Sequence, residues 1–383
     1  MKHNTGTRSI LRRSIKLTTL SHASGQNEVA GRIRQQFVEL TKDEPHIHAR
    51  NAAQKIGITE AELLASHLGS GVYGLTADWE NILLAAAMLG ELRAITRNDA
   101  CVHERIGHYE NLSFSKHGPR HMGLALNPEI DLRLFLHQWR YGYAVMENMG
   151  KSGRASSLQF FDEDGHAVHK IYTTDNTNTT AYCELVNQFK DEACEFPHIA
   201  HIKHTHESRP GKAGTDAAAL ERDWRAMRDV HEFFPLLKKH NVSRLSALGL
   251  MPKDLANQIT VNGVQRALQE AAARACEIMV FVGNGGCIQI HSGTVSNLKQ
   301  IGPWFNVLDE RFDLHLNGEK IEQCWVTRKP SDDGVITSIE AYDEGGELAI
   351  QLFGKRKPGD PELSLWRDIV KACECTLNDA ETV

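Results

Sequence analysis

The sequence predicts an α+β fold built by tandem duplication, in which two similar domains each have a large antiparallel β-sheet with packed helices. Two observations predict this fold. Segments with helix and strand patterns follow one another in the order helices, strands, linker, helices, strands. In addition, segments of the two halves resemble each other at offsets between 181 and 186 residues. A repeat of this length indicates duplicated domains rather than a solenoid of short units.

Three pairs of segments carry the internal resemblance. They are residues 95–107 with 281–293, residues 126–136 with 308–318, and residues 157–172 with 338–353. The first pair matches Asn98 to Asn284 and Cys101 to Cys287. Because the matched segments keep the same order in both halves, we expect both halves to have the same topology.

The first half begins with helical patterns over residues 28–94. Thr59 and Glu62 form a T-x-x-E capping box at one helix start. Strand patterns follow from Arg93 to Tyr172, and a helix is expected over residues 178–193. A stretch with two prolines and two glycines, residues 194–215, is predicted to be a linker.

The second half repeats this order. Helices are expected over residues 216–275, strands over 277–354, and a last helix over 362–373. Asp, Asn and Gly lie in the turns between the strands, as antiparallel hairpins require. The predicted domains are a disordered leader (1–27), an N-terminal repeat (28–193), the linker (194–215), a C-terminal repeat (216–375) and a tail (376–383).

Composition restricts the class of protein. Hydrophobic residues make up 41% and charged residues 24% of the 383 residues, an ordinary globular profile. The net charge of −6 gives no reason to expect nucleic acid as a partner. Eight scattered cysteines without a CxxC pair indicate reduced thiols, and no apolar run is long enough to span a bilayer. We therefore expect a cytoplasmic protein that is not embedded in a membrane. The Arg, Ser and Thr content of residues 1–27 leaves a transit peptide open as an alternative to a leader.

His231 stands out in the stretch RDVHEFFPLLKKHN (228–241). Val230, Phe233, Phe234 and Leu237 have the spacing of one apolar helix face. Pro235 would clash with the carbonyl of His231, so a kink or a helix end is expected there. His231 would then lie in a last helical turn, either as an ordinary histidine at a helix end or as a ligand at the edge of a cleft.

Further histidines offer a second kind of site. His198, His201, His204 and His206 lie close together in the linker and could gather a metal ion, although no cysteine or carboxylate partners accompany them. His46 and His48 are expected to be ordinary surface residues.

A dispersed set of residues suits haem. Lys329 and Trp325 point to the same side of one predicted strand, and Gln351 shares a face with Phe353. Haem iron requires a neutral imidazole, its macrocycle requires apolar walls, and its propionates require Arg or Lys. Ordinary surface cations and a histidine at a helix end remain the alternative explanation.

Long segments of the chain resemble the bacterial HemS/ChuS/HmuS haem-utilisation proteins. These segments are RDWRAMRDVHEFFPLLKKHN, CEIMVFVGNGGCIQI, WVTRKP, QLFGKR, ACVHE, LNPEIDLRLFLHQW and LQFFDEDGHAVHKIY. The resemblance runs from about residue 30 to residue 370 and implies a pair of similar α+β halves, in agreement with the duplication.

The resemblance also implies functional residues. His231 would be the axial ligand of haem b, and Arg133 would approach the opposite haem face as the catalytic residue. Rim contacts would come from Arg244, Lys329, Gln351 and Arg356. Phe353 stands where the family usually has tyrosine, so it would keep an aromatic wall without a hydroxyl. His103 would be a second haem position, although its counterpart in the other repeat is Gln289.

Two activities remain possible under this resemblance. The protein would bind haem and degrade it with O2 and an external electron donor, thereby releasing iron. Alternatively, it would be a carrier that passes haem from an inner-membrane importer to a downstream acceptor. A metal buffer acting through the linker histidines is a third possibility. For the leading case we expect haem in a cleft between the two halves, since ligand sites often form at such boundaries.

Overall fold

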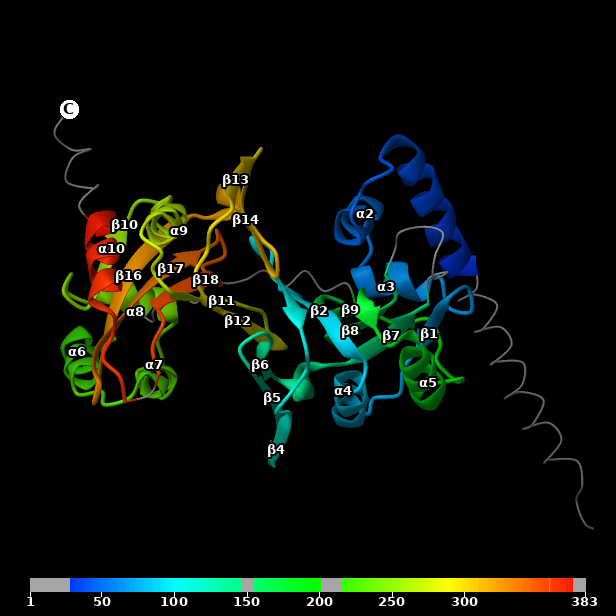
Figure 1. Cartoon of the computed structure of the whole chain (residues 1–383), viewed down its shortest axis with the longest axis horizontal. Coiled ribbons are helices and arrows are strands. Elements are labelled where there is room, and N and C mark those ends of the chain that lie inside the picture. The colour runs from blue at the N-terminus through cyan, green and yellow to red at the C-terminus, as the bar shows by residue number, and fades with distance from the viewer. Residues whose placement is uncertain (1–27, 147–154, 201–214, 358, 375–383) are drawn as a thin grey trace, which may run out of the picture. The chain divides into compact units, whose positions relative to one another are not determined.

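The computed structural model describes residues 28–146, 155–200, 215–357 and 359–374, and the chain forms two compact units (Figure 1). The first unit comprises residues 1–82, 138–167 and 179–201, and the second comprises residues 83–137, 168–178 and 202–383. Strands from the first half of the sequence thus belong to the same unit as nearly all of the second half. The predicted leader, the tail from residue 376 and most of the linker lie outside the described residues.

The first unit contains helices and antiparallel strands. Residues 28–43 are helical. The helices that come next in this part of the sequence are α2 (Ala49–Ile56), α3 (Glu60–Ala65), α4 (Trp79–Ala87) and α5 (Thr179–Phe189). The strands β1 (Val72–Gly74), β7 (Tyr141–Val145) and β8 (Ser157–Phe161) pair in that order.

Two predictions about this region have different outcomes. The capping box is confirmed, because the Thr59 hydroxyl accepts from the Glu62 backbone at 3.2 Å and Glu62 accepts from the Thr59 backbone at 2.8 Å. The prediction that residues 28–94 are all helical is wrong. The three residues of β1 are too few to show a strand period, and they are strand only because they pair with β7.

The second unit contains most strands. In one sheet, β9 (Ala167–Thr177), β2 (Gly90–Arg97), β3 (Cys101–Gly107), β15 (Phe312–Asn317), β14 (Trp304–Asp309) and β13 (Leu298–Ile301) are neighbours in that order. The other sheet, called here the β10–β4 sheet, has the order β10 (Ala256–Ile259), β16 (Gln323–Ser331), β17 (Gly334–Tyr342), β18 (Leu348–Gly354), β11 (Ile278–Gly283), β12 (Cys287–Gly293), β6 (Asp131–Leu134), β5 (Arg120–Leu126) and β4 (Ser113–His117). The pairs of the β10–β4 sheet are antiparallel throughout.

The two repeats exchange strands. β12 of the second repeat pairs with β6 of the first, and β3 of the first pairs with β15 of the second. In Figure 1, the yellow-green β12 accordingly lies beside the cyan-green β6. The predicted fold class is confirmed, and the structure adds that neither repeat completes its sheet with its own strands alone.

Asn98 and Asn284 show the symmetry of this exchange. The Asn98 side-chain oxygen accepts from the backbone of Ala100 and Cys101, as the Asn284 oxygen accepts from Gly286 and Cys287. The Asn98 amide donates to Gly283 and Ala349 of the second repeat, and the Asn284 amide donates to Arg97 and Val168 of the first. Each asparagine therefore stabilises its own turn through its side-chain oxygen and bonds to the backbone of the other repeat through its amide.

Helices lie on both faces of the β10–β4 sheet. α9 (Gly263–Ala273) and α10 (Ser364–Glu374) pack against one face in a large apolar core with the inward residues of β11, β16, β17 and β18. On the other face, α6 (Ala217–Arg225), α7 (Phe233–Lys239) and α8 (Arg244–Leu250) pack against β10, β16 and β17. The prediction of helices throughout residues 216–275 is wrong at β10, a four-residue strand that β16 holds by pairing.

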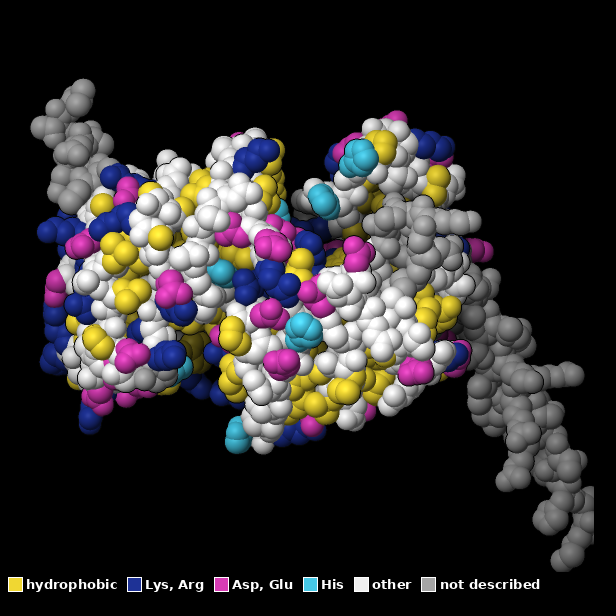
Figure 2. All heavy atoms as spheres, viewed as in Figure 1, with side chains coloured by type: hydrophobic (Ala, Val, Ile, Leu, Met, Phe, Trp, Pro, Cys, Tyr) yellow, Lys and Arg dark blue, Asp and Glu magenta, His cyan; other side chains and the backbone are white. Residues whose placement is uncertain are grey.

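Charged side chains of both signs are interspersed on the face shown in Figure 2. Ion pairs such as Arg93–Glu104 and Arg311–Glu91 occur among the described residues. Such a mixed surface agrees with the modest net charge of −6. Within the described residues, no helix has both the length and the apolar character needed to cross a membrane.

Candidate haem site

One face of the β10–β4 sheet carries the predicted site residues. Strand pairing places Glu340 opposite Gln351, and Gln351 opposite Phe281. Farther along the sheet, Ile288 lies opposite Arg133. Because residues directly opposite each other point to the same side, and because residues two apart on a strand share a face, these side chains line one surface. The strand β6, which carries Arg133, is three strand spacings or about 14 Å across the sheet from β18, which carries Gln351.

The sequence analysis expected haem in a cleft between the two halves, and this location stays a prediction. Arg133 does come from the first repeat and His231 from the second, but β6 joins the β10–β4 sheet directly. Both residues therefore belong to one compact unit.

Helices cover only part of this face. Phe233 of α7 is buried against Trp224, with ring centroids 4.5 Å apart, and lies near a cation of the sheet and a cation of α8. Lys329 Nζ is 4.7 Å and Arg244 Cζ is 5.2 Å from the centre of the Phe233 ring, within the range of cation–π attraction. Beyond this cover, Phe353 and Phe281 are partly exposed, with ring centroids 5.1 Å apart. The uncovered strands thus present an apolar surface next to a covered cationic one.

His231 lies at the edge of the helical cover, in the one-turn helix η2 (Val230–Glu232) just before α7. Its side chain is 90% exposed. Its Nδ1 contacts Asp229 Oδ1 at 2.6 Å, and the same oxygen accepts from the His231 backbone at 2.7 Å. Chiefly this backbone bond lowers the pKa of Asp229. Among the described residues no hydrogen bond engages Nε2, so this nitrogen is available as a ligand.

A kink or a helix end was predicted at Pro235; the helix end is wrong, whereas the helical path does change just before it, between η2 and α7. Pro235 is the third residue of α7, and the chain before it has already left the α-helical path in η2. In the first turn the proline takes away no intrahelical hydrogen bond, so it favours a helix start here. The predicted apolar face is also partly wrong, since Phe234 is 72% exposed while Leu236 is buried.

Glu340 is a buried carboxylate at the centre of the covered part, and the sequence analysis missed it. Its Oε1 accepts from Arg244 at 2.7 Å, from Lys329 at 2.9 Å and from Gln351 at 3.0 Å. Its Oε2 accepts from Arg244 at 2.8 Å and from the Tyr342 hydroxyl at 2.5 Å. Three predicted site residues therefore meet at one unpredicted residue. Two cations share one carboxylate, which leaves one positive charge in excess.

Burial and mutual attraction set the protonation of this cluster. Burial lowers the pKa of Lys329 to about 8, despite the opposing effect of Glu340. Burial alone would raise the pKa of Glu340, but Arg244 and Lys329 hold it well below its ordinary value. Burial also opposes the charge of Arg244, yet Glu340 raises the Arg244 pKa above its ordinary value. At neutral pH all three groups are therefore charged.

The two remaining cations have partners of their own. Arg133 is about one-third exposed and forms an ion pair with Asp131 on the same strand. Arg356 pairs with Asp333 at 3.1 Å, and its charge contributes to the lowered pKa of Asp229 beside His231. Arg356 therefore lies near the His231 end of the site, and Arg133 lies at the far side of the open strands.

Comparison with known proteins identifies the fold family. The model of the haemin-degrading HemS/ChuX domain matches residues 57–189 and again residues 241–373. This chain belongs to the HemS family. The two matches fall within the two predicted repeats, whose bounds otherwise remain a prediction.

Individual relatives of the HemS family are similar over most of their length. The hemin transport protein HmuS of Yersinia pestis is 40% identical over 338 residues, which are 87% of this chain and 95% of HmuS. The crystal structure of holo-PhuS, a heme-binding protein from Pseudomonas aeruginosa, is 39% identical with a TM-score of 0.83. The heme degrading enzyme ChuS of Escherichia coli O157:H7 is 36% identical with a TM-score of 0.82. Each alignment with these structures covers 90% of this chain and 99% of the relative.

His103, the residue suggested as a second haem position, is fully buried on β3. Its ring packs against Phe312 at 5.0 Å, and burial holds its pKa well below the ordinary value. Its counterpart Gln289 is also fully buried and donates to the Ala94 carbonyl at 3.0 Å. The equivalence of these positions favours a packing role for His103, because no part of its ring reaches solvent.

The other histidines offer no defined metal site in the described part of the chain. His201, His204 and His206 lie outside the described residues, and His198 is exposed. His46 and His48 are exposed, as predicted.

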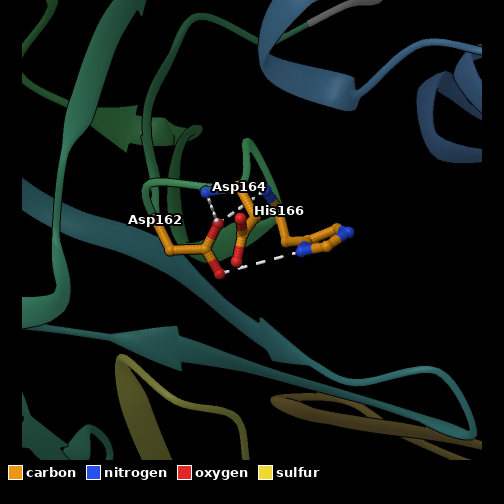
Figure 3. A group of neighbouring side chains, drawn as sticks. All are labelled: Asp162, Asp164 and His166. Atoms are coloured by element: carbon orange, nitrogen blue, oxygen red, sulfur yellow. Dashed lines mark hydrogen bonds and ion pairs between the residues drawn. The ribbon is translucent and has the colours of Figure 1, made fainter. Parts of the chain in front are cut away.

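Asp162, Asp164 and His166 form a compact group in the turn between β8 and β9 (Figure 3). Asp162 Oδ1 accepts from the backbones of Asp164 and His166 at 3.1 and 2.8 Å. In the other repeat, Asp343 accepts from the Glu347 backbone at 2.9 Å in the same kind of turn. The shared geometry assigns Asp162 to turn formation, and the His166 ring lies in solvent.

Proposed function

We propose that this chain is a cytoplasmic haem-binding protein of bacterial haem utilisation that degrades haem and so releases iron. One observation carries the proposal. Within the part of the chain that the structure describes, His231 presents an Nε2 without a hydrogen-bond partner at the edge of an apolar sheet face, next to a cluster with one excess positive charge. A flat apolar molecule with a central metal and anionic arms fits this combination of groups.

The donor set suits each part of haem. A neutral imidazole suits the iron, and the Phe281–Phe353 surface suits the macrocycle. Arg244 and Gln351 are partly exposed and offer N–H donors for propionates, which charge-assisted hydrogen bonds hold well. Lys329 is buried and bound to Thr327 and Glu340, so it contributes its positive charge. The names of the relatives HmuS, PhuS and ChuS, which mention hemin or heme, agree with this proposal.

Haem supplies the redox chemistry of ring opening when it is bound, with O2 as oxidant and an external donor as the source of electrons. The residues of the chain orient and bind. His231 would hold the iron, and the Glu340 cluster would attract the propionates. Arg133 offers N–H donors from the other side of the open strands, directly or through water, and is the proposed catalytic residue.

A carrier without enzymatic activity is the second candidate. Two relatives, HmuS of Yersinia pestis and HemS of Yersinia enterocolitica, are named hemin transport proteins. The exposed position of His231 would also allow transfer of haem from an inner-membrane importer or to a downstream acceptor. Both candidates use the same binding residues and differ only in the fate of the bound haem.

The test begins with one equivalent of haemin added to the purified protein, and a reductant is then supplied in air with catalase present. We expect a sharp Soret band on mixing and its decay to a ring-opened pigment. His231→Ala should lose the sharp band, whereas His166→Ala, which removes an exposed histidine elsewhere, should keep it. Absence of any Soret change in the wild type would refute haem binding. A band that forms but survives reduction in air would leave binding intact and favour the carrier.

A further inference from the structure

Asp229 and His231 form a pair that ordinary stability considerations do not explain. Both side chains lie largely in solvent, 60% and 90% exposed. Ion pairs at such exposure contribute little to folding, because water screens them and ordering two side chains costs entropy. The short contact of 2.6 Å between Asp229 Oδ1 and His231 Nδ1 therefore indicates a different role.

The local backbone builds this contact. Asp229 has extended dihedral angles, φ −143° and ψ 138°, and precedes the first turn of η2. Its Oδ1 accepts from the His231 backbone at 2.7 Å, as a capping residue does. The same oxygen then lies within reach of the ring of the same residue. One carboxylate oxygen thus fixes both the backbone and the side chain of His231.

Nearby charged groups are engaged elsewhere. Arg228 pairs with Asp332 through Nε at 2.9 Å and Nη2 at 3.0 Å. Arg356 pairs with Asp333, and the Glu232 carboxylate accepts from the Arg228 backbone at 3.2 Å. Asp229 is therefore the acidic side chain in contact with the imidazole.

A neutral imidazole has one N–H and one lone pair. An acceptor at Nδ1 selects the tautomer with the proton on Nδ1 and leaves the lone pair on Nε2. Carboxylates in this position orient metal-binding histidines and increase the basicity of the ring.

We propose that Asp229 is a positioning residue that holds His231 with Nδ1 as donor and Nε2 turned outward to bind the iron of haem. This inference rests on the proposed function, because it assigns Asp229 a role in ligation by His231. In the sequence the pair is D-V-H. This spacing alone does not predict the contact, which depends on Asp229 being the N-cap of η2.

The first experiment needs no haem. Nitrogen-15 NMR of wild-type protein at pH 8 should show His231 as the tautomer with the proton on Nδ1. The Nε2–H tautomer would overturn the inference.

The second experiment separates the cap from the ring contact. Asp229→Ser keeps a side-chain oxygen that can cap η2 but is too short to reach Nδ1. Asp229→Asn keeps an acceptor and loses the charge. In the haem complex of Asp229→Ser we expect a weaker iron–histidine stretching band in ferrous resonance Raman spectra. Its haem should dissociate roughly 10–100-fold faster, with Asp229→Asn intermediate. The matched control is Asp332→Asn, which removes a nearby carboxylate that pairs with Arg228 and should leave both values unchanged.

The outcomes distinguish haem ligation by His231 from positioning of His231 by Asp229. If His231→Ala abolishes the iron–histidine band while Asp229→Ser equals Asp332→Asn, the positioning role is refuted and haem ligation stands. If His231→Ala leaves the wild-type spectrum unchanged, ligation by His231 itself fails. Thermal unfolding of the haem-free variants, expected to match the wild type, shows that any difference arises at the ligand.

Discussion

Glu340 and Gln159 occupy equivalent places in the two repeats, and their surroundings differ in charge. Glu340 on β17 is buried and accepts from Arg244, Lys329 and Gln351. Gln159 on β8 is also buried, and its amide donates to the Ser157 hydroxyl at 3.0 Å. The same strand position thus has a neutral polar contact in one repeat and a network of charges in the other.

The difference teaches that equivalent strand positions of the two repeats can hold a neutral contact or a charged network. The first repeat also has a buried cation nearby in sequence, because Lys170 occupies the place of Gln351. A buried carboxylate is costly unless charges and hydrogen bonds compensate it. In the second repeat Arg244 and Lys329 compensate Glu340 and leave one positive charge in excess, whereas Gln159 of the first repeat carries no charge.

The largest effect is expected when Glu340 is replaced by the residue of the other repeat. Glu340→Gln leaves Lys329 and Arg244 buried without their shared counter-charge. Breaking a buried ion pair in this way costs about 3–5 kcal/mol of folding free energy. Urea denaturation monitored by circular dichroism measures the change. Glu344→Gln, at an exposed position in the next turn, is the control and should stay within about 0.5 kcal/mol of the wild type. A Glu340→Gln protein as stable as this control would show that the network does not hold the second repeat.

The next effect concerns turnover and Arg133. The equivalent position on β15 is His315, whose Nδ1 contacts Asn306 at 2.6 Å, so the first sheet offers no guanidinium there. We expect Arg133→Ala to keep haem affinity and to slow ring opening on the order of 10²-fold, as the loss of one positioned donor does. The decay of the Soret band in a single turnover measures the rate of ring opening. Decay at the wild-type rate would remove Arg133 from the catalytic role.

A smaller effect is the pH dependence of haem affinity that Lys329 is expected to cause. Its pKa is lowered to about 8, so the ammonium that attracts propionates is lost as pH rises through that value. Haem affinity should fall between pH 7 and pH 9 by roughly fivefold, which corresponds to about 1 kcal/mol. Lys329→Met should flatten this dependence. Equal slopes in both proteins would contradict a direct role of Lys329 in anion binding.

The smallest effect is expected from Phe353→Tyr. Tyr172 occupies this position in the first repeat, and Phe353 is partly exposed, so the added hydroxyl can reach solvent. We expect stability within about 0.5 kcal/mol of the wild type and haem dissociation slowed no more than about threefold. Stopped-flow transfer of haem to an acceptor such as apomyoglobin measures the rate. A loss of affinity would mean that the aromatic surface is packed more tightly than the partial exposure of Phe353 indicates.

The sequence was sufficient for the duplication, because Asn98 and Asn284 recur with their turns. It also named Arg244 and Lys329, which the structure brings together at Glu340. It was insufficient for the exchange of strands, since nothing in the local pattern of β6 indicates that its partner is β12 rather than a strand of its own repeat. Pairing over such a distance depends on the whole fold.

Glu340 and Asp229 escaped prediction for a related reason. Val335, Thr337, Ile339 and Ala341 alternate as one inward face, so the opposite face with Glu340 had the pattern of a solvent-facing side. The helices α7 and α8 cover that side, and no local signal shows it. Asp229 has the sequence pattern of an ordinary exposed acid. Its contact with the His231 ring depends on its extended backbone dihedral angles before η2, which the sequence does not show.

The exchange of strands also delays strand pairing during synthesis of the chain on the ribosome. Leu134 of β6 pairs with Cys287 of β12, about 150 residues later in the chain. At ribosomal rates of about 5–20 residues per second, the edge of β6 waits roughly 8–30 seconds for its partner. During that interval a nascent chain exposes strand edges that can pair with other chains. A ribosome that stalls between the repeats would therefore release a chain prone to aggregate, although every residue of the first repeat has been made.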